Sequence, residues 1–163
     1  MSTALKSIST AASTFEPALN DRLYPPRPIL AASIAVFRQA RVLLARRANA
    51  PLKGQYSLPG GVVEIGETLR EAALRELMEE VGVEAEIVAF NDHIEAITGG
   101  ARGVETHYVI ATFAGIWTRG EPKTSAEADR VLWASQDDLA LLSTTPGLAR
   151  IVARAGKLVE AAR

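Results

Sequence analysis

The chain has 163 residues, of which 48% are hydrophobic, so it is long enough for one ordinary domain with a substantial core. Its formal net charge of −1 at pH 7 provides no overall field that would attract nucleic acid or an anionic membrane, and we expect neither as a partner. The sequence contains no cysteine, which excludes disulfides, thiolate metal ligands and a cysteine nucleophile, and this agrees with a cytoplasmic location.

Residues 1–28 are predicted to form a loosely ordered N-terminal arm, because they are rich in Ser, Thr and Ala and lack the apolar segment of a secretory signal. Three prolines at the end of this arm cannot continue a helix or a central strand, so we expect one folded domain over residues 29–163. Apolar and β-branched residues then predict a hairpin of two strands, 29–37 and 41–47. The next segment, APLKGQYSLPGG, has two prolines and three glycines, which argues against a regular element there.

A helix is predicted between Thr68 and Gly82. Thr68 and Glu71 have the T-x-x-E spacing of a capping box, in which each residue bonds the other's backbone N–H. Gly82 supplies the stop signal, because glycine readily adopts the left-handed conformation that ends many helices. Apolar side chains recur at helical spacing between these two residues, so one side of the helix is expected to pack against the core.

The second half of the chain contains further strands and a second helix. Residues 85–97 and 105–118 are strand-like and are joined by the loop TGGARG, which is typical of a longer hairpin connection. A short strand is expected at residues 130–134, and helical spacing of apolar residues begins at Pro146. The order of strands, helix, strands and helix predicts an α/β fold with a mixed β-sheet between helices, which would bury both faces of the sheet.

The first helix concentrates negative charge, since Glu76, Glu79 and Glu80 lie within about one turn of each other. Like charges at these spacings cost about 0.2 to 0.5 kcal/mol per pair, and Arg75 offsets only part of that cost. A solvated acidic face is one interpretation. The adjacent LPGG segment favours another, because its glycines let the backbone approach closely, and carboxylates with a backbone carbonyl are ligands that Mg²⁺ or Mn²⁺ selects.

The same segment resembles the Nudix box, a 23-residue motif written G-x5-E-x7-R-E-U-x-E-E-x-G-U, where U is a bulky aliphatic residue. The resemblance covers about residues 29 to 155 and includes GQYSLPGG upstream of the box, where Tyr56 stands in place of the family's frequent Trp. It also includes Glu127 downstream, ahead of the last expected strand. All fixed positions of the box, residues 61–83, are filled: Gly61, Glu67, Arg75, Glu76, Leu77, Glu79, Glu80, Gly82 and Val83.

The resemblance implies an α/β/α sandwich that hydrolyses a nucleoside diphosphate linked to another moiety with the help of Mg²⁺ or Mn²⁺. By position in the motif, Glu76 and Glu80 would be carboxylate metal ligands, and the Gly60 carbonyl would be a further ligand. Arg75 would orient the glutamates. The remaining box carboxylates, Glu79 and Glu67, would hold water beside the metal or a second ion.

The general base varies within the family, so we place it on Glu127 first and on Glu79 second. The chemistry suits a carboxylate, because cleavage of a pyrophosphate needs a group that removes a proton from the attacking water and needs no covalent nucleophile. For substrate binding we name two cations, Arg46 before the box and Arg102 in the TGGARG loop. Each also has a plainer interpretation, as ordinary surface charge for Arg46 and as an exposed hairpin tip for Arg102.

The substrate is expected to be a small nucleotide, and the overall layout most resembles the short group that acts on ADP-ribose and nucleotide sugars. The chain lacks the proline about sixteen residues after the box that marks ADP-ribose pyrophosphatases in this family. A nucleoside triphosphate pyrophosphohydrolase that removes oxidised nucleotides is the alternative enzyme, and a non-catalytic nucleotide sensor is the alternative class. The oligomeric state stays open, with a homodimer among the options.

Overall fold

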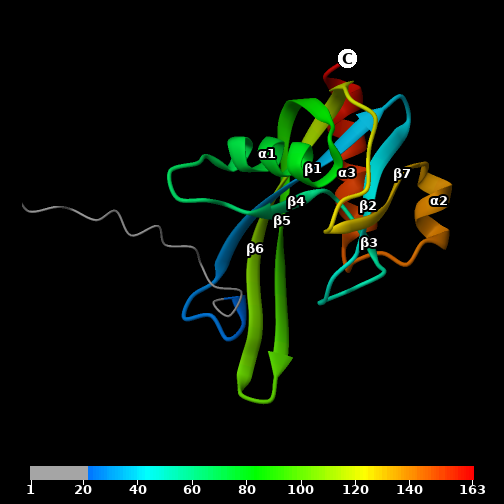
Figure 1. Ribbon diagram of the computed structural model, residues 1–163. Helices are drawn as coiled ribbons and strands as arrows, with labels where there is room; N and C mark the ends of the chain where they lie inside the picture. The colour runs from blue at the N-terminus through cyan, green and yellow to red at the C-terminus, as the bar shows by residue number, and fades with distance from the viewer. Residues whose placement is uncertain (1–21) are drawn as a thin grey trace, which may run out of the picture.

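Figure 1 shows the computed structural model of the chain, which describes residues 22–163. Seven strands and three helices follow one another within these residues, and their order agrees with the predicted α/β class. The elements in chain order are β1 (Ile29–Arg38), β2 (Arg41–Arg47), β3 (Tyr56–Ser57), β4 (Gly60–Val62), α1 (Leu69–Val81), β5 (Glu84–Gly100), β6 (Gly103–Arg119), β7 (Ala128–Ala134), α2 (Gln136–Leu141) and α3 (Leu148–Ala161).

The strands form one mixed sheet in which β1 is central. β1 runs parallel to β6 from Ile29 to Phe37 and antiparallel to β2 and β4. The strand order is β3-β2-β1-β6-β5, and β7 pairs with β2. Along β6 and β5 the sheet continues as a long hairpin that extends beyond the other strands in Figure 1. This arrangement brings β4 and the start of β7 next to α1.

The core has two halves because the side chains of β1 alternate between the two faces of the sheet. Ile34 and Val36 pack with α1 on one face, whereas Ala35 and Phe37 pack with α3 on the other. Helices α1 and α3 each bury a stripe of apolar side chains against these strands. Leu77 is part of the stripe on α1. The structure therefore confirms the α/β/α sandwich.

Helix α1 begins and ends where the sequence predicts. The Thr68 hydroxyl accepts a hydrogen bond from the Glu71 backbone N–H at 3.2 Å, and the Glu71 carboxylate accepts one from the Thr68 N–H at 2.8 Å. Gly82 ends the helix with a φ angle of 70°, a left-handed conformation that favours glycine. These two caps fix the rotation of the helix, which determines the direction in which its glutamates point.

The segment APLKGQYSLPGG, for which no regular element was expected, contains two short strands, so that prediction was wrong. β3 pairs with β2, and β4 pairs with β1 through Ser33 and Gly60. Tertiary pairing with neighbouring strands supplies the hydrogen bonds that the local composition does not favour. The Pro59 carbonyl between the two strands accepts a hydrogen bond from Ile34 N–H at 3.1 Å.

The expected loop between the two long strands is only a two-residue turn, Ala101 and Arg102, since β5 continues to Gly100 and β6 begins at Gly103. The Thr98 and Thr106 hydroxyls bond across this extension at 2.7 Å. The glycine-rich sequence thus belongs to the strands and the turn.

Two further differences lie near the C-terminus of the chain. Helix α2 was not predicted, although Ser135 and Asp138 form a capping box at its start. The last helix begins at Leu148 with Gly147 as its N-terminal cap, and not at Pro146. Six residues give α2 too little periodicity to be recognised by pattern alone.

Most of the predicted N-terminal arm lies outside the described residues. Its last part contacts the long hairpin: Tyr24 N–H donates to the Glu105 carbonyl at 2.7 Å, and the Arg102 guanidinium lies 4.2 Å from the centre of the Tyr24 ring. Among residues 22–163, no helix combines the length and the apolar character needed to cross a membrane.

Candidate active site

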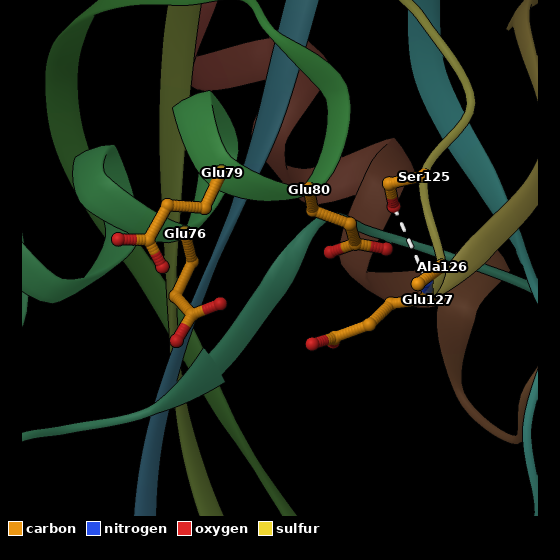
Figure 2. Close-up of a pocket in the computed structure, with 6 residues that line it drawn as sticks. All are labelled: Glu76, Glu79, Glu80, Ser125, Ala126 and Glu127. Atoms are coloured by element: carbon orange, nitrogen blue, oxygen red, sulfur yellow. Dashed lines mark hydrogen bonds between the residues drawn. The ribbon is translucent and has the colours of Figure 1, made fainter.

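A cleft between α1 and the loop before β7 gathers four carboxylates. Glu76, Glu79 and Glu80 line it from the helix, and Glu127 lines it from the opposing loop together with Ser125 and Ala126. Figure 2 shows the side chains of Glu76, Glu80 and Glu127 directed toward a common space. The structure therefore brings the glutamates of α1 together with Glu127, which lies far along the chain from them.

Arg75 organises one side of this cleft. Its guanidinium donates to both carboxylate oxygens of Glu67, at 2.6 and 3.0 Å, in the two-pronged geometry that favours arginine over lysine. It also donates to Glu76 at 2.8 Å and to the more exposed Glu79 at 3.1 Å. A further bond to the Val62 carbonyl at 3.1 Å anchors the guanidinium to β4. The carboxyl of Glu67 has a lowered pKa because of its hydrogen bonds to Arg75.

Glu80 lies deeper in the cleft and forms no salt bridge with a described residue. Burial raises its pKa to about 7, and a hydrogen bond from Gly60 N–H at 3.0 Å opposes this only in part. Burial likewise raises the pKa of Glu76, although Arg75 opposes the change. The charge of Glu127 raises the pKa of both groups further. The cleft thus holds more negative charge than its own cations compensate.

Two glycines make room for this arrangement. A β-carbon on Gly61 would collide with the carboxylate of Glu76, and a β-carbon on Gly60 would collide with the Ala32 carbonyl and with Ser33 of β1. Only glycine therefore allows β4 to pass between β1 and the glutamates of α1. The close approach also brings the Gly60 backbone within hydrogen-bond distance of Glu80.

The two cations predicted to bind substrate have other partners. Arg46 donates to both oxygens of Asp129, at 2.7 and 3.0 Å, and Arg102 stacks on Tyr24 at the hairpin tip. Their role in substrate binding stays a prediction. Arg47 is the cation whose charge lowers the pKa of Glu80. The register of β2 against β7 shifts between Arg46 and Arg47, and no local pattern in the sequence indicates which of the two lies nearer the cleft.

A family comparison agrees with this geometry: the NUDIX domain matches residues 27–155. The chain belongs to the Nudix family. Its Nudix box supplies the close approach of Gly61 to Glu76, the Arg75 network and the glutamates of the cleft.

Individual relatives share parts of the chain. A MutT-like protein of Streptomyces ambofaciens is 30% identical over 115 residues, which are 71% of this chain and 68% of the relative. An ADP-ribose pyrophosphatase of Methanocaldococcus jannaschii is 45% identical over 62 residues, so that the match spans 38% of this chain and only 36% of that relative. The crystal structure of a MutT NUDIX hydrolase from Burkholderia pseudomallei superposes with a TM-score of 0.69 at 27% identity, covering 78% of this chain and 98% of that chain.

The Nudix cleft suits a hard divalent cation by the chemistry of its donors, which are all oxygen atoms. Among residues 22–163, no three acidic or histidine side chains lie close enough together to hold a metal ion as they stand. Glu76 is drawn toward Arg75 and Glu80 toward Gly60 N–H. Cation binding would exchange these contacts for metal contacts and would offset the cost of the buried negative charge.

Proposed function

We propose that this protein is a metal-dependent Nudix pyrophosphohydrolase. Its substrate would be a nucleoside diphosphate linked to another moiety, of the ADP-ribose or nucleotide-sugar type. The observation that carries the proposal is the convergence of Glu76 and Glu80 with Glu127 on one cleft, with the Gly60 backbone beside them. These groups offer metal ligands on one side and a proton acceptor on the other.

Glu76, Glu80 and the Gly60 carbonyl are the residues that would hold Mg²⁺ or Mn²⁺, with Glu79 and Glu67 as supporting carboxylates. When bound, such a cation neutralises phosphate oxygens and lowers the pKa of nearby water. Arg75 keeps Glu67 and Glu76 in place through its fixed guanidinium plane. Arg75 thereby restricts these two long side chains before a cation binds.

Glu127 is the better candidate for the general base. The Glu79 carboxylate accepts a hydrogen bond from Arg75 at 3.1 Å, which keeps it occupied. Glu127 projects across the cleft toward Glu76 and Glu80 (Figure 2), where it would remove a proton from a water molecule attacking phosphorus. The proton leaves on the carboxylate, the phosphorus–oxygen bond of the anhydride breaks, and the second phosphate departs with the bridging oxygen.

Support for the substrate type comes from the relative of Methanocaldococcus jannaschii, which is named an ADP-ribose pyrophosphatase. The deciding experiment is a hydrolysis screen with Mg²⁺ over nucleoside diphosphate sugars, dinucleotides and triphosphates, in which the products are identified by mass spectrometry. We expect turnover of a diphosphate-linked compound into two monophosphate products. Release of inorganic pyrophosphate from a triphosphate alone would replace this proposal with triphosphate hydrolysis, and absence of turnover across the panel would favour a nucleotide sensor.

A further inference from the structure

The loop that carries Glu127 is held by hydrogen bonds to α1, to the segment after β2 and within itself. Glu127 is exposed and lies directly before β7. The location of its carboxylate therefore depends on the conformation of the backbone at residue 127. Four residues before Glu127, Lys123 N–H donates to the Val81 carbonyl at the end of α1 at 2.9 Å. The loop is thus tied to the helix that carries the other glutamates.

Ser125 fixes the backbone of Glu127 from within the loop. Its hydroxyl oxygen accepts hydrogen bonds from the backbone N–H groups of Glu127 and Ala128, each at 3.2 Å, and the first is drawn in Figure 2. The Ser125 N–H donates to the Ala128 carbonyl at 2.9 Å. Together these bonds close a tight turn around Glu127.

Asn49 holds the same loop from outside, across 77 positions of sequence. Its side-chain amide donates to the Ala126 carbonyl at 3.1 Å, and the neighbouring Ala48 N–H donates to the Glu127 carbonyl at 2.9 Å. The peptide units on both sides of residue 127 are therefore bound to the segment after β2. An exposed side-chain amide can bond water equally well, so this contact adds little to folding stability.

We propose that Asn49 and Ser125 are positioning residues that set the location of the Glu127 carboxylate. The inference rests on the proposed function, in which Glu127 is the general base. A base must lie within hydrogen-bond distance of the water that it deprotonates, and a displacement of about 1 Å can reduce a rate on the order of a hundredfold. The two residues therefore affect the rate of the reaction far more than the stability of the fold.

The test is a double-mutant cycle on kcat in the full chain with Mg²⁺ and the substrate found by the screen. Asn49→Ala and Ser125→Ala should each lower kcat about tenfold with KM changed less than about twofold, because each removes hydrogen bonds to the loop backbone that position the base. In a Glu127→Gln background each should lower kcat less than about twofold further. Ser125→Thr keeps the hydroxyl and should restore most of the rate, and Thr124→Ala, which removes the exposed hydroxyl beside Ser125, is the matched control.

Hydrogen exchange of the protein without substrate provides a readout that does not depend on turnover. Ser125→Ala should speed exchange of the Glu127 and Ala128 amides, and Asn49→Ala should speed exchange within residues 123–128, while α1 and α3 keep their protection. Equal kcat losses in the presence and absence of the Glu127 carboxylate, or unchanged kcat in both alanine variants, would overturn the positioning role and leave the proposed function intact. Failure of the wild-type chain to turn over any substrate would instead overturn the function, whatever the exchange data show, and the positioning role with it.

Discussion

Replacing Glu80 with Gln should stabilise the metal-free protein at neutral and alkaline pH. Burial raises the pKa of Glu80 to about 7, from 4.5 for an ordinary glutamate. A carboxyl whose pKa is raised in the folded state contributes stability below pH 4.5 and loses that contribution as the pH rises through about 7. The wild-type protein should therefore become less stable between these two values, and the neutral Gln side chain should not show this loss.

The difference between a pKa of 4.5 and one of about 7 corresponds to about 3 kcal/mol of unfolding free energy at pH 8. For a chain of this size, about 1 kcal/mol shifts the melting temperature by roughly 2 to 4 °C. Glu80→Gln should thus melt about 6 to 12 °C higher than the wild type at pH 8 in EDTA. A Gln oxygen can still accept the hydrogen bond from Gly60 N–H, so this contact does not cancel the gain.

Thermal melts in EDTA at pH 5 and pH 8 measure this difference, with Glu64→Gln as the control because Glu64 is exposed and lies outside the cleft. Saturating Mg²⁺ at pH 8 should stabilise the wild type and have little effect on Glu80→Gln, whose kcat should fall about a hundredfold or more. Equal melting temperatures of the two proteins at pH 8 in EDTA would refute the buried-charge reasoning. Near wild-type turnover of Glu80→Gln would show that the glutamates form an ordinary solvated acidic face and do not bind a catalytic metal ion.

Three further results are expected. Gly61→Ala should lower kcat by at least about tenfold, since its β-carbon displaces the Glu76 carboxylate, and steady-state rates beside a far-ultraviolet spectrum would separate this from unfolding. Arg75→Lys keeps the charge but loses the paired bonds to Glu67, so the Mg²⁺ concentration for half-maximal rate should rise; an unchanged concentration would argue against the orienting role. Activity should vanish in EDTA and return with Mg²⁺ or Mn²⁺, whereas full turnover in EDTA would contradict the metal assignment.

The part of the site that lies on α1 could be predicted from the sequence because it depends on local geometry. Glu76, Glu79 and Glu80 must share a side of any helix that contains them, and the Thr68 and Gly82 caps define that helix. The β1 and β2 hairpin was predictable for a similar reason, since its two strands are separated by a short polar break and pair directly. Local patterns therefore determine the scaffold of the cleft.

Contacts between distant segments could not be read from the sequence. Asn49 meets Ala126 only because β2 pairs with β7, and no local pattern indicates that register. The pairing of Arg46 with Asp129 likewise follows from the tertiary fold. The strands β3 and β4 were missed because their hydrogen bonds come from β2 and β1 and not from their own composition.

Hydrolysis of the identified substrate in ¹⁸O-labelled water with Mg²⁺ shows directly which bond is cleaved. Attack by water on phosphorus, with Glu127 as the proton acceptor, places one labelled oxygen in a phosphate product. Mass spectrometry of the products should show that label on one of the two monophosphates and none on the sugar carbon. Label found only on the released sugar would show that the carbon–oxygen bond breaks, and it would contradict cleavage of a pyrophosphate bond in this cleft.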